Sequence, residues 1–239
     1  MCGCGKPGRT WKTWRQGSYE AVRGKRDAFS VSVFVPRNFN PSMRLRLSTR
    51  FIEFPRRPLV MGIVNVNEDS FSGDGTLDFD QAIRLARSQA AAGADIIDVG
   101  AESARTNRAA ITPDEELRRL HGFVERWEAV TSGLSPRDGE QIWPPVLSIN
   151  TWRPEVVAGI LTSGKVGIIN DMSALPDDRN ARLCAESGAA LLIMHSVGEP
   201  KIPHFSQRWD DIMTEMERFF AEKIILATAA GLPADAIIL

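Results

Sequence analysis

The sequence is poor in cysteine, histidine and tyrosine, with 3 Cys, 3 His and 1 Tyr among 239 residues. Two of the cysteines lie together in Cys2-Gly3-Cys4. So few cysteines give no disulfide framework, and neither His121 nor His204 has the spacing of a metal motif. No convincing Ser, His and Asp order for a nucleophilic triad is present either. These absences favour a protein of a reducing compartment, and we expect a cytoplasmic location.

Long hydrophobic runs are also absent. No apolar run approaches the ~20 residues that a membrane-spanning helix needs. Residues 1–9 lack the apolar core of a secretory signal, so we expect neither secretion nor a membrane partner. Hydrophobic residues make up 43% of the chain and charged residues 25%, values ordinary for a globular protein with one sizeable core.

Acidic residues are scarce in the first part of the chain. Residues 1–57 contain 13 basic and 3 acidic residues, although the whole chain has a net charge of -1. Residues 1–42 show no helical or strand period, and we interpret them as a basic, disordered extension, with Met43 as a plausible start. A nucleic-acid-binding arm or an organellar transit peptide are alternative hypotheses for this segment. We expect no nucleic-acid partner.

Residues 43–239 repeat a unit of apolar strand, polar loop and helix. The first residues, 44–54, alternate like a short β-hairpin. Consecutive units without a Gly-x-Gly-x-x-Gly after the first strand favour a (β/α)8 TIM-type barrel over a dinucleotide-binding fold. We expect an incomplete barrel with about six of its eight strands. The predicted strands are 59–66, 95–99, 145–149, 166–169, 189–194 and 234–239, and the predicted helices are 78–92, 113–130, 154 onward, 178–187 and 207–230.

Several residues mark where these helices begin and end. Asp78 is a suitable N-cap, and Thr112 followed by Pro113 and Glu115 has the spacing of a capping box. Gly93 and Gly231 are expected to end their helices. We expect the last helix to bury Ile212, Met216, Phe219, Phe220 and Ile224.

Polar residues follow the predicted strands at their carboxyl ends. They are Asn65, Glu102, Asn150, Asn170 and His195. An Asn side chain both donates and accepts hydrogen bonds, so it suits a flat heterocycle with mixed donors and acceptors along one edge. One such Asn often only closes a turn, but three at strand ends favour a ligand site. We interpret His195 and Cys184 as structural, whereas Arg105 is a candidate for binding an anion.

Five segments resemble, in order, the signature segments of the dihydropteroate synthase family. They are Met61-Gly-Ile-Val-Asn-Val-x-x-Asp-Ser-Phe-Ser, Ile97-Asp-Val-Gly-x-Glu-Ser-x-Arg105, Ser148-Ile-x-Thr151, Ile169-Asn-Asp171 and Met194-His195. The resemblance covers residues 44–239. It implies a TIM barrel and a transferase of folate biosynthesis. That enzyme joins 6-hydroxymethyl-7,8-dihydropterin pyrophosphate to 4-aminobenzoate with Mg2+, giving 7,8-dihydropteroate and pyrophosphate.

The resemblance also implies roles for single residues. Asn65 matches the contact to Mg2+ and pyrophosphate, and Arg105 matches a loop arginine near the anion. The substrate-binding positions are Asn150, Asn170, Met172, Met194, Ser70, Phe71 and Ala104. Residues 69–75 and 102–107 match two loops that close over the aminobenzoate site. The family commonly forms homodimers, so a homodimer is possible for a full-length protein.

The chain departs from the family pattern at some of these positions. Asn150 stands where the family usually has Asp, and Ala104 stands where it usually has Thr. The family also continues beyond the position of Leu239 with strands that carry an active-site Lys and an Arg-x-His motif. We therefore expect the 239-residue chain to be an inactive fragment. A non-catalytic pterin-binding paralogue or partner subunit, and a pterin-dependent methyltransferase, remain alternative hypotheses.

Overall fold

The computed structural model describes residues 44–53, 57–67, 75–102, 109–198, 200–202 and 209–239. Residues 42–239 form one compact unit. The predicted extension, 1–42, lies outside the described residues and stays a prediction. None of the helices in the described ranges is both long and apolar enough to cross a membrane.

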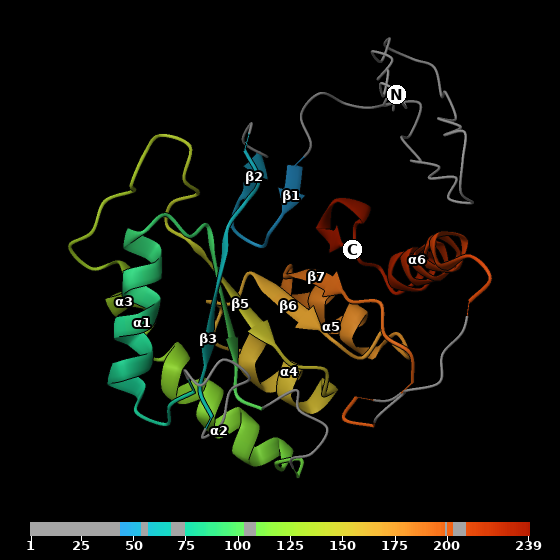
Figure 1. The fold of residues 1–239 in the computed structure, drawn as a ribbon, viewed down its shortest axis with the longest axis horizontal. Helices are drawn as coiled ribbons and strands as arrows, with labels where there is room; N and C mark the ends of the chain where they lie inside the picture. Colours follow the sequence, from blue (N-terminus) through green and yellow to red (C-terminus); the bar gives the residue numbers. More distant parts are fainter. Residues whose placement is uncertain (1–43, 54–56, 68–74, 103–108, 199, 203–208) are drawn as a thin grey trace, which may run out of the picture. The chain divides into compact units, whose positions relative to one another are not determined.

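Six parallel strands form the central sheet, and they pair in the order in which they occur in the chain (Figure 1). A doubly wound sheet doubles back in its strand order, whereas a TIM barrel does not. The α/β fold class and the six predicted barrel strands are therefore confirmed. Within the described residues the first and last of these strands each have one neighbour, so the sheet is open. The strands are β3 (Met61–Asn65), β4 (Ile96–Gly100), β5 (Val146–Asn150), β6 (Ile168–Asp171), β7 (Ala190–Ile193) and β8 (Ile237–Ile238).

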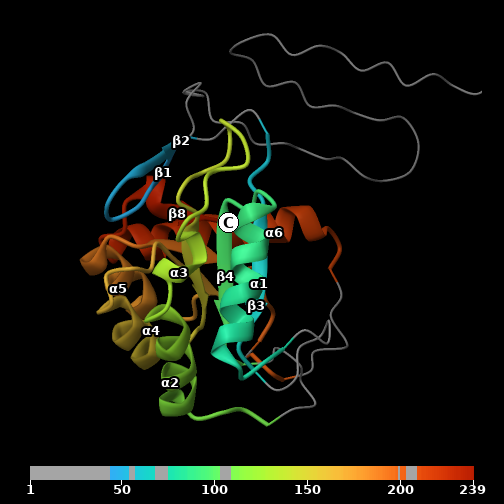
Figure 2. The same cartoon turned by 90° about the vertical axis from the view of Figure 1, so that its left-hand side faces the viewer.

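The helices lie along one face of this sheet (Figures 1 and 2). They are α1 (Phe79–Ala91), α2 (Pro113–Val124), α3 (Glu128–Thr131), α4 (Pro154–Leu161), α5 (Arg179–Ser187) and α6 (Ile212–Ala229). Alternate strand residues face them, because side chains of a strand point to opposite faces in turn. These residues are almost completely buried: Val64, Ile97, Val99, Leu147, Ile149, Ile169, Leu191 and Ile193. The opposite face carries Asp98, Ser148 and the strand-end asparagines among apolar residues such as Val146 and Ile168.

The predicted caps are confirmed in part. The Asp78 carboxylate accepts hydrogen bonds from the N–H groups of Asp80 and Gln81, and Thr112 Oγ1 accepts one from the N–H of Glu115 at 3.2 Å. The Glu115 carboxylate, expected to complete a capping box, binds Arg118 and Arg119. α6 ends before Gly231, which takes a φ of +95° that favours glycine.

The predicted helix 113–130 is divided in the structure into α2 and α3. The break follows Val124, where i→i+3 turns replace the helix: the N–H of Trp127 donates to the carbonyl oxygen of Val124. Lys165 is a further partner of this end. Its Nζ donates to the carbonyl oxygens of Val124 at 3.2 Å and Glu125 at 3.5 Å. The last carbonyls of a helix need such partners, because they have none within the helix. Lys165 therefore stabilises an end of α2 that local sequence does not mark.

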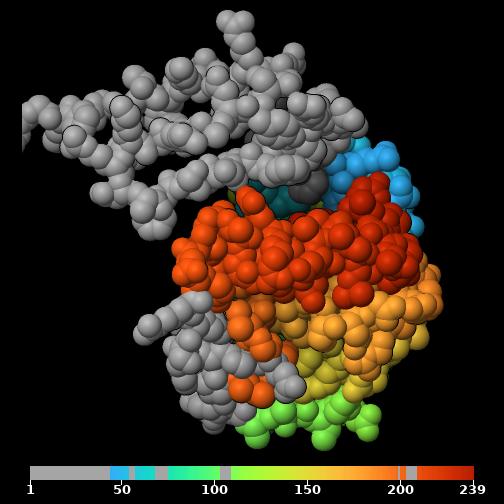
Figure 3. Space-filling model, turned by 90° about the vertical axis from the view of Figure 1, so that its right-hand side faces the viewer, coloured from blue at the N-terminus to red at the C-terminus, as the bar shows by residue number. Residues whose placement is uncertain are grey.

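The predicted burial of the last helix is wrong at Ile212, which is 38% exposed. Ala227 is the one buried residue of α6, while Met216, Phe219, Phe220 and Ile224 are half-buried. α6 packs on α5 at the β8 end of the sheet, where the described elements flank it on one side. Figure 3 shows the resulting exposed band of orange and red residues across this face.

The predicted hairpin is present as β1 (Arg44–Arg46) and β2 (Phe51–Glu53), which pair antiparallel. It lies at the end of the sheet where the strands begin (Figure 2). Leu45 and Ile52 are buried there. Arg46 Nε donates to Asp235 Oδ1 at 2.7 Å and so fastens the hairpin to the 3-10 turn η1 (Ala234–Ala236).

Candidate functional site

The carboxyl ends of the strands bring the three predicted asparagines into one row. Asn65 pairs with Gly100 of β4, Gly100 pairs with Asn150 of β5, and Asn150 pairs with Asn170 of β6. They belong to the strand positions that alternate with the helix-facing core, so their side chains share the other face. Gly100 adds no side chain between Asn65 and Asn150, and this leaves the row open to a ligand.

A buried carboxylate lies beneath this row. Asp98 is 3% exposed, and it pairs across the strands with Ser148, which is completely buried. Asp98 Oδ1 accepts a hydrogen bond from Ser148 Oγ at 2.5 Å, and Oδ2 accepts one from Asn170 Nδ2 at 3.1 Å. Asn150 also hydrogen-bonds to this carboxylate. Asp98 therefore gathers both asparagine amides around one acceptor.

The environment of Asp98 changes its acidity in two opposing ways. Burial raises the pKa of Asp98, because an apolar surrounding disfavours its charged form, and this effect exceeds that of its hydrogen bonds. Those bonds also fix the neighbouring amides. Because Asn170 donates one N–H to Asp98, its oxygen and its second N–H are left for a ligand. Asn150 is held by the same carboxylate.

A second network connects the loops around the strand ends. Arg153, which precedes α4, donates to Glu102 Oε2 at 2.6 Å and also binds Glu116 of α2. The Nζ atom of Lys201, a residue that follows β7, lies 3.3 Å from Glu102 Oε1. The Glu116 side chain is fully buried, and burial raises its pKa. Arg153 is thus the counter-ion of Glu116, and it shares Glu102 with Lys201.

The remaining predicted residues are placed as follows. Met172 directly follows β6, and Met194, 37% exposed, directly follows β7. His195 packs edge-on against Phe219, with ring centroids 4.8 Å apart, which agrees with its predicted structural role. Cys184 is buried in the core as predicted, and burial raises the pKa of its thiol. Ser70, Phe71, Ala104 and Arg105 lie outside the described residues.

Asn65 is the candidate for holding a metal. The described residues contain no group of three or more His, Cys, Asp or Glu that could bind one. Magnesium prefers oxygen ligands and is usually held by one or two carboxylates together with water and substrate phosphates, so an amide oxygen would be a neutral substitute for one of these. The amide oxygen of a half-buried Asn65 at a strand end fits that requirement.

Asp98, Ser148 and Arg153 contribute to the site, but the sequence did not single them out for a role. Asp98 and Ser148 interrupt apolar strands at positions that face away from the helices, and this placement was a usable signal. Arg153 gave none, because its partners lie 51 and 37 residues away in the sequence.

Comparison with known proteins identifies the family of this chain. A family model described as pterin binding enzyme matches residues 61–239. The chain belongs to the pterin binding enzyme family. The resemblance to dihydropteroate synthases, inferred from five short segments, is confirmed by relatives that carry that name.

Three relatives show the extent of the similarity. Dihydropteroate synthase of Escherichia coli K12 is 36% identical over 185 residues, 76% of this chain and 60% of that protein. The structure of the Yersinia pestis enzyme with a sulfonamide drug complex has a TM-score of 0.68 at 33% identity, covering 82% of this chain and 66% of that one. The Burkholderia cenocepacia enzyme complexed with 7,8-dihydropteroate has a TM-score of 0.66 at 27% identity, covering 82% and 62%.

This member of the pterin binding enzyme family therefore spans about 60% of the length of the E. coli relative that it matches. The matched part includes the row of asparagines and the buried Asp98, which lie between residues 61 and 239.

Proposed function

We propose that this chain forms the pterin-binding side of a dihydropteroate synthase. The reaction joins 6-hydroxymethyl-7,8-dihydropterin pyrophosphate to 4-aminobenzoate, giving 7,8-dihydropteroate and pyrophosphate. The observation that carries the proposal is the cluster of Asp98, Asn150 and Asn170 at the strand ends. Membership of the pterin binding enzyme family supports the same substrate class.

The cluster has the chemistry that a pterin requires. The pteridine ring carries N–H donors beside carbonyl and ring-nitrogen acceptors on one edge. An amide held by Asp98 offers an oxygen and an N–H side by side, and Asn150 and Asn170 offer two such pairs. Met172 and Met194 would border the ring as apolar surfaces. Because Asp98 fixes the amides in advance, little rotational entropy is lost when the ring binds.

The rest of the proposed reaction is charge stabilisation and positioning. The bond between the pterin methylene carbon and the pyrophosphate oxygen breaks, and the amine of 4-aminobenzoate attacks that carbon and then loses a proton. Asn65 would hold Mg2+, which when bound supplies positive charge to the departing pyrophosphate. Arg105 would bind the same anion. Ser70, Phe71 and Ala104 belong to the loops that would position the amine, and no protein nucleophile is needed.

One observation favours a second candidate, a pterin-binding protein without turnover. Asn150 is neutral, so it brings no negative charge to the carboxyl ends of the strands, and its amide hydrogen-bonds to the buried Asp98. A carboxylate here would favour the cationic pterin that forms as pyrophosphate leaves. Loss of such a charge-assisted bond costs about 1.5–3 kcal/mol, so a tenfold to hundredfold lower rate would follow.

Binding and turnover together test the proposal. We expect the pterin pyrophosphate to bind, and Asn170→Leu to weaken binding at least about tenfold for one lost hydrogen bond. Gln141→Leu is the matched control, because Gln141 donates to Ala90 and Ala94 at the other end of the sheet. It should leave the affinity of the folded protein unchanged. Turnover is measured on a full-length protein, because the 239-residue chain is expected to be inactive alone. Pyrophosphate release there that requires both substrates and Mg2+ supports the synthase, and binding without release there supports the second candidate. Absence of pterin binding contradicts both.

Four further properties belong to the proposal. They are magnesium dependence, a cytoplasmic location, a homodimer in a full-length protein, and the absence of nucleic-acid partners. Asn65→Ala should weaken magnesium binding and lower magnesium-dependent pyrophosphate release in a full-length protein, and it should leave pterin affinity without magnesium unchanged.

A further inference from the structure

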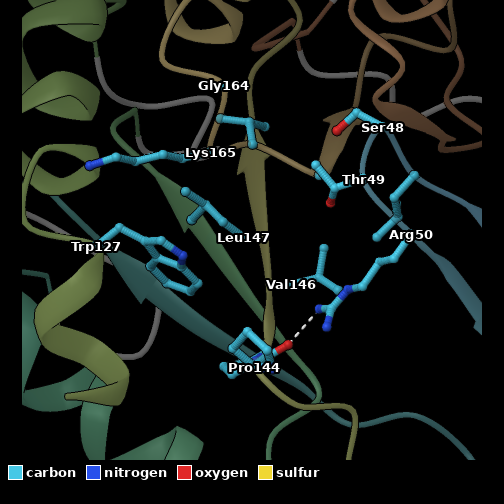
Figure 4. Close-up of a pocket in the computed structure, with 13 residues that line it drawn as sticks. Ser48, Thr49, Arg50, Trp127, Pro144, Val146, Leu147, Gly164 and Lys165 are labelled. Atoms are coloured by element: carbon cyan, nitrogen blue, oxygen red, sulfur yellow. Dashed lines mark hydrogen bonds between the residues drawn. The ribbon is translucent and has the colours of Figure 1, made fainter.

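A cavity of about 340 Å³ lies at the end of the sheet opposite the asparagine row. Its walls are the turn of the β1–β2 hairpin, the residues that enter β5 and β6, and Trp127 (Figure 4). Its volume lies within the range of small-molecule sites. We call it the Arg50 pocket; its lining residues are Leu47–Arg50, Trp127, Pro144–Leu147 and Gly164–Gly167.

The charge of this lining is one-sided. It includes Arg50 and Lys165 but no acidic residue. The Lys165 amino group is already neutralised, because it points away from the cavity to Glu128 at 2.8 Å (Figure 4). Arg50 has no carboxylate within salt-bridge distance among the described residues. Its guanidinium donates to the main-chain carbonyls of Trp143, at 3.1 Å, and Pro144.

Arg50 therefore presents a fixed cation that has no counter-ion in the part of the chain that the structure describes. Two carbonyl contacts hold the guanidinium in place but do not cancel its charge. Burial lowers the pKa of Arg50, which reflects the cost of taking this charge out of water. An arginine keeps its proton nevertheless. An anion that enters the cavity would recover part of that cost without moving the side chain.

The other walls add hydrogen-bond donors and apolar surface. Figure 4 shows the hydroxyl-bearing Ser48 and Thr49 on the hairpin side and the indole of Trp127 on the opposite side. Val146 and Leu147 lie between them. An indole N–H only donates, and the hydroxyls can donate. The hairpin side, with Arg50, Ser48 and Thr49, thus suits the acceptor-rich end of a ligand, and the indole ring, Val146 and Leu147 suit an apolar body.

We propose that the Arg50 pocket binds a small aromatic carboxylate. The carboxylate accepts hydrogen bonds from the Arg50 guanidinium, and the ring lies between Trp127 and Val146. This site is separate from the asparagine row, which lies at the other end of the strands, and it does not depend on the proposed reaction.

The test uses the indole N–H signals of the six tryptophans in two-dimensional NMR of the full chain. The probes are benzoate, its neutral isostere benzamide, and inorganic phosphate. Trp127→Phe identifies the Trp127 signal, and Trp152→Phe identifies Trp152, which lies near the strand ends beside Arg153. We expect benzoate to shift Trp127 saturably and to leave Trp152 unchanged, while benzamide has no effect at the same concentration.

Two variants separate the pocket from a general loss of structure. Arg50→Lys keeps the charge but loses the planar fork of donors, and it should weaken benzoate at least about tenfold. Arg179→Lys makes the same change in an exposed pair with Asp177, outside this lining, and should leave affinity within about twofold. Equal effects of the two variants, equal shifts from benzamide, or phosphate binding as tightly as benzoate would each overturn the proposal. So would a shift of Trp152 in place of Trp127.

Discussion

Asp95 and Asp98 lie three residues apart, and their pKa values shift in opposite directions. Burial raises the pKa of Asp95, but its bonds to Arg57, at 2.8 Å, and to the N–H groups of Val60 and Ile142 outweigh that effect, so the pKa is lowered. The hydrogen bonds to Asp98 come from neutral groups, and burial dominates. One carboxylate therefore favours folding at neutral pH, and the other favours it in acid.

For Asp95→Asn we expect a loss of stability at pH 7. A lowered pKa means that the ionised group stabilises the fold above its unfolded pKa, and that this contribution is lost as pH falls through the folded pKa. Because Arg57 is partly solvated, we expect a loss of about 1–2 kcal/mol. Urea unfolding at pH 7 and pH 3 measures it, and the difference from the parent should shrink in acid. Glu222→Gln, in an exposed pair with Arg218, is the control and should change little.

For Asp98→Asn we expect the reverse pH dependence. A raised pKa gives a contribution that is present below the unfolded pKa and is lost as pH rises through the folded pKa. The parent should therefore gain stability relative to the variant when the pH is lowered from 7 to 4. Urea unfolding across that range measures the difference. Ser148→Ala keeps the carboxyl group, so it should retain the parent's dependence. A difference that does not change with pH would contradict this assignment.

The sequence predicted the strand-end asparagines of the site, but it did not predict the buried carboxylate to which two of them bind. Asn65, Asn150 and Asn170 could be found because each ends an apolar run. The acceptor beneath them could not be assigned from the sequence, because the bond from Asn170 to Asp98 joins residues 72 positions apart. Which amide meets which carboxylate depends on strand register, and register follows from the packing of the whole sheet.

Among the elements, Arg153 joins the segment after β4 to α2. Arg153→Met would leave Glu102 with Lys201 alone and would remove the cation paired with the fully buried Glu116, and uncompensated buried charge is costly. We expect a loss of about 3 kcal/mol in the free energy of unfolding, measured in urea. The matched control is Arg179→Met, because Arg179 pairs with Asp177 at the surface, where such pairs contribute little. Equal losses in the two variants would show that the network does not stabilise the fold.

The start of α2 is stabilised by the Thr112 cap. Thr112→Ala removes the acceptor of the Glu115 N–H, and we expect a loss of about 1 kcal/mol. Thr112→Ser keeps the hydroxyl and should restore most of it. Thermal unfolding of both variants gives the comparison. If the serine and alanine variants are equally stable, the cap does not contribute.

Two predicted helix bounds are wrong: α6 begins at Ile212 and not at 207, and α2 ends at Val124 and not at 130. The other bounds agree within about one residue where a local signal marks them. The cap at Thr112 uses a residue three positions away, so local spacing reveals it. The end of α2 at Val124 involves Lys165, which is 41 residues away and belongs to a different unit of the fold. The exposure of Ile212 was missed for a similar reason, because an apolar stripe does not reveal whether another element covers it.

In the molecule as a whole, apolar side chains remain exposed around the open sheet. Val60, just before β3, is 52% exposed, and Ile63, within β3, is 55% exposed. Leu239, after β8, is 53% exposed. The strand order could be predicted from the repeated units. The exposure of these apolar side chains could not, because it depends on what covers each edge of the sheet. An exposed strand edge with apolar side chains pairs readily with another chain.

We therefore expect this chain to self-associate at micromolar concentration through the edge at β3. Ile63→Lys places a charge beside that edge and should increase the monomer fraction in analytical ultracentrifugation, because pairing would bury the charge. Ile225→Lys is the matched comparison, since Ile225 on α6 is 67% exposed but lies away from β3. If only Ile63→Lys increases the monomer fraction, association occurs through the sheet edge. If only Ile225→Lys increases it, association occurs through α6 and the prediction is contradicted. A parent chain that is already monomeric would contradict it as well.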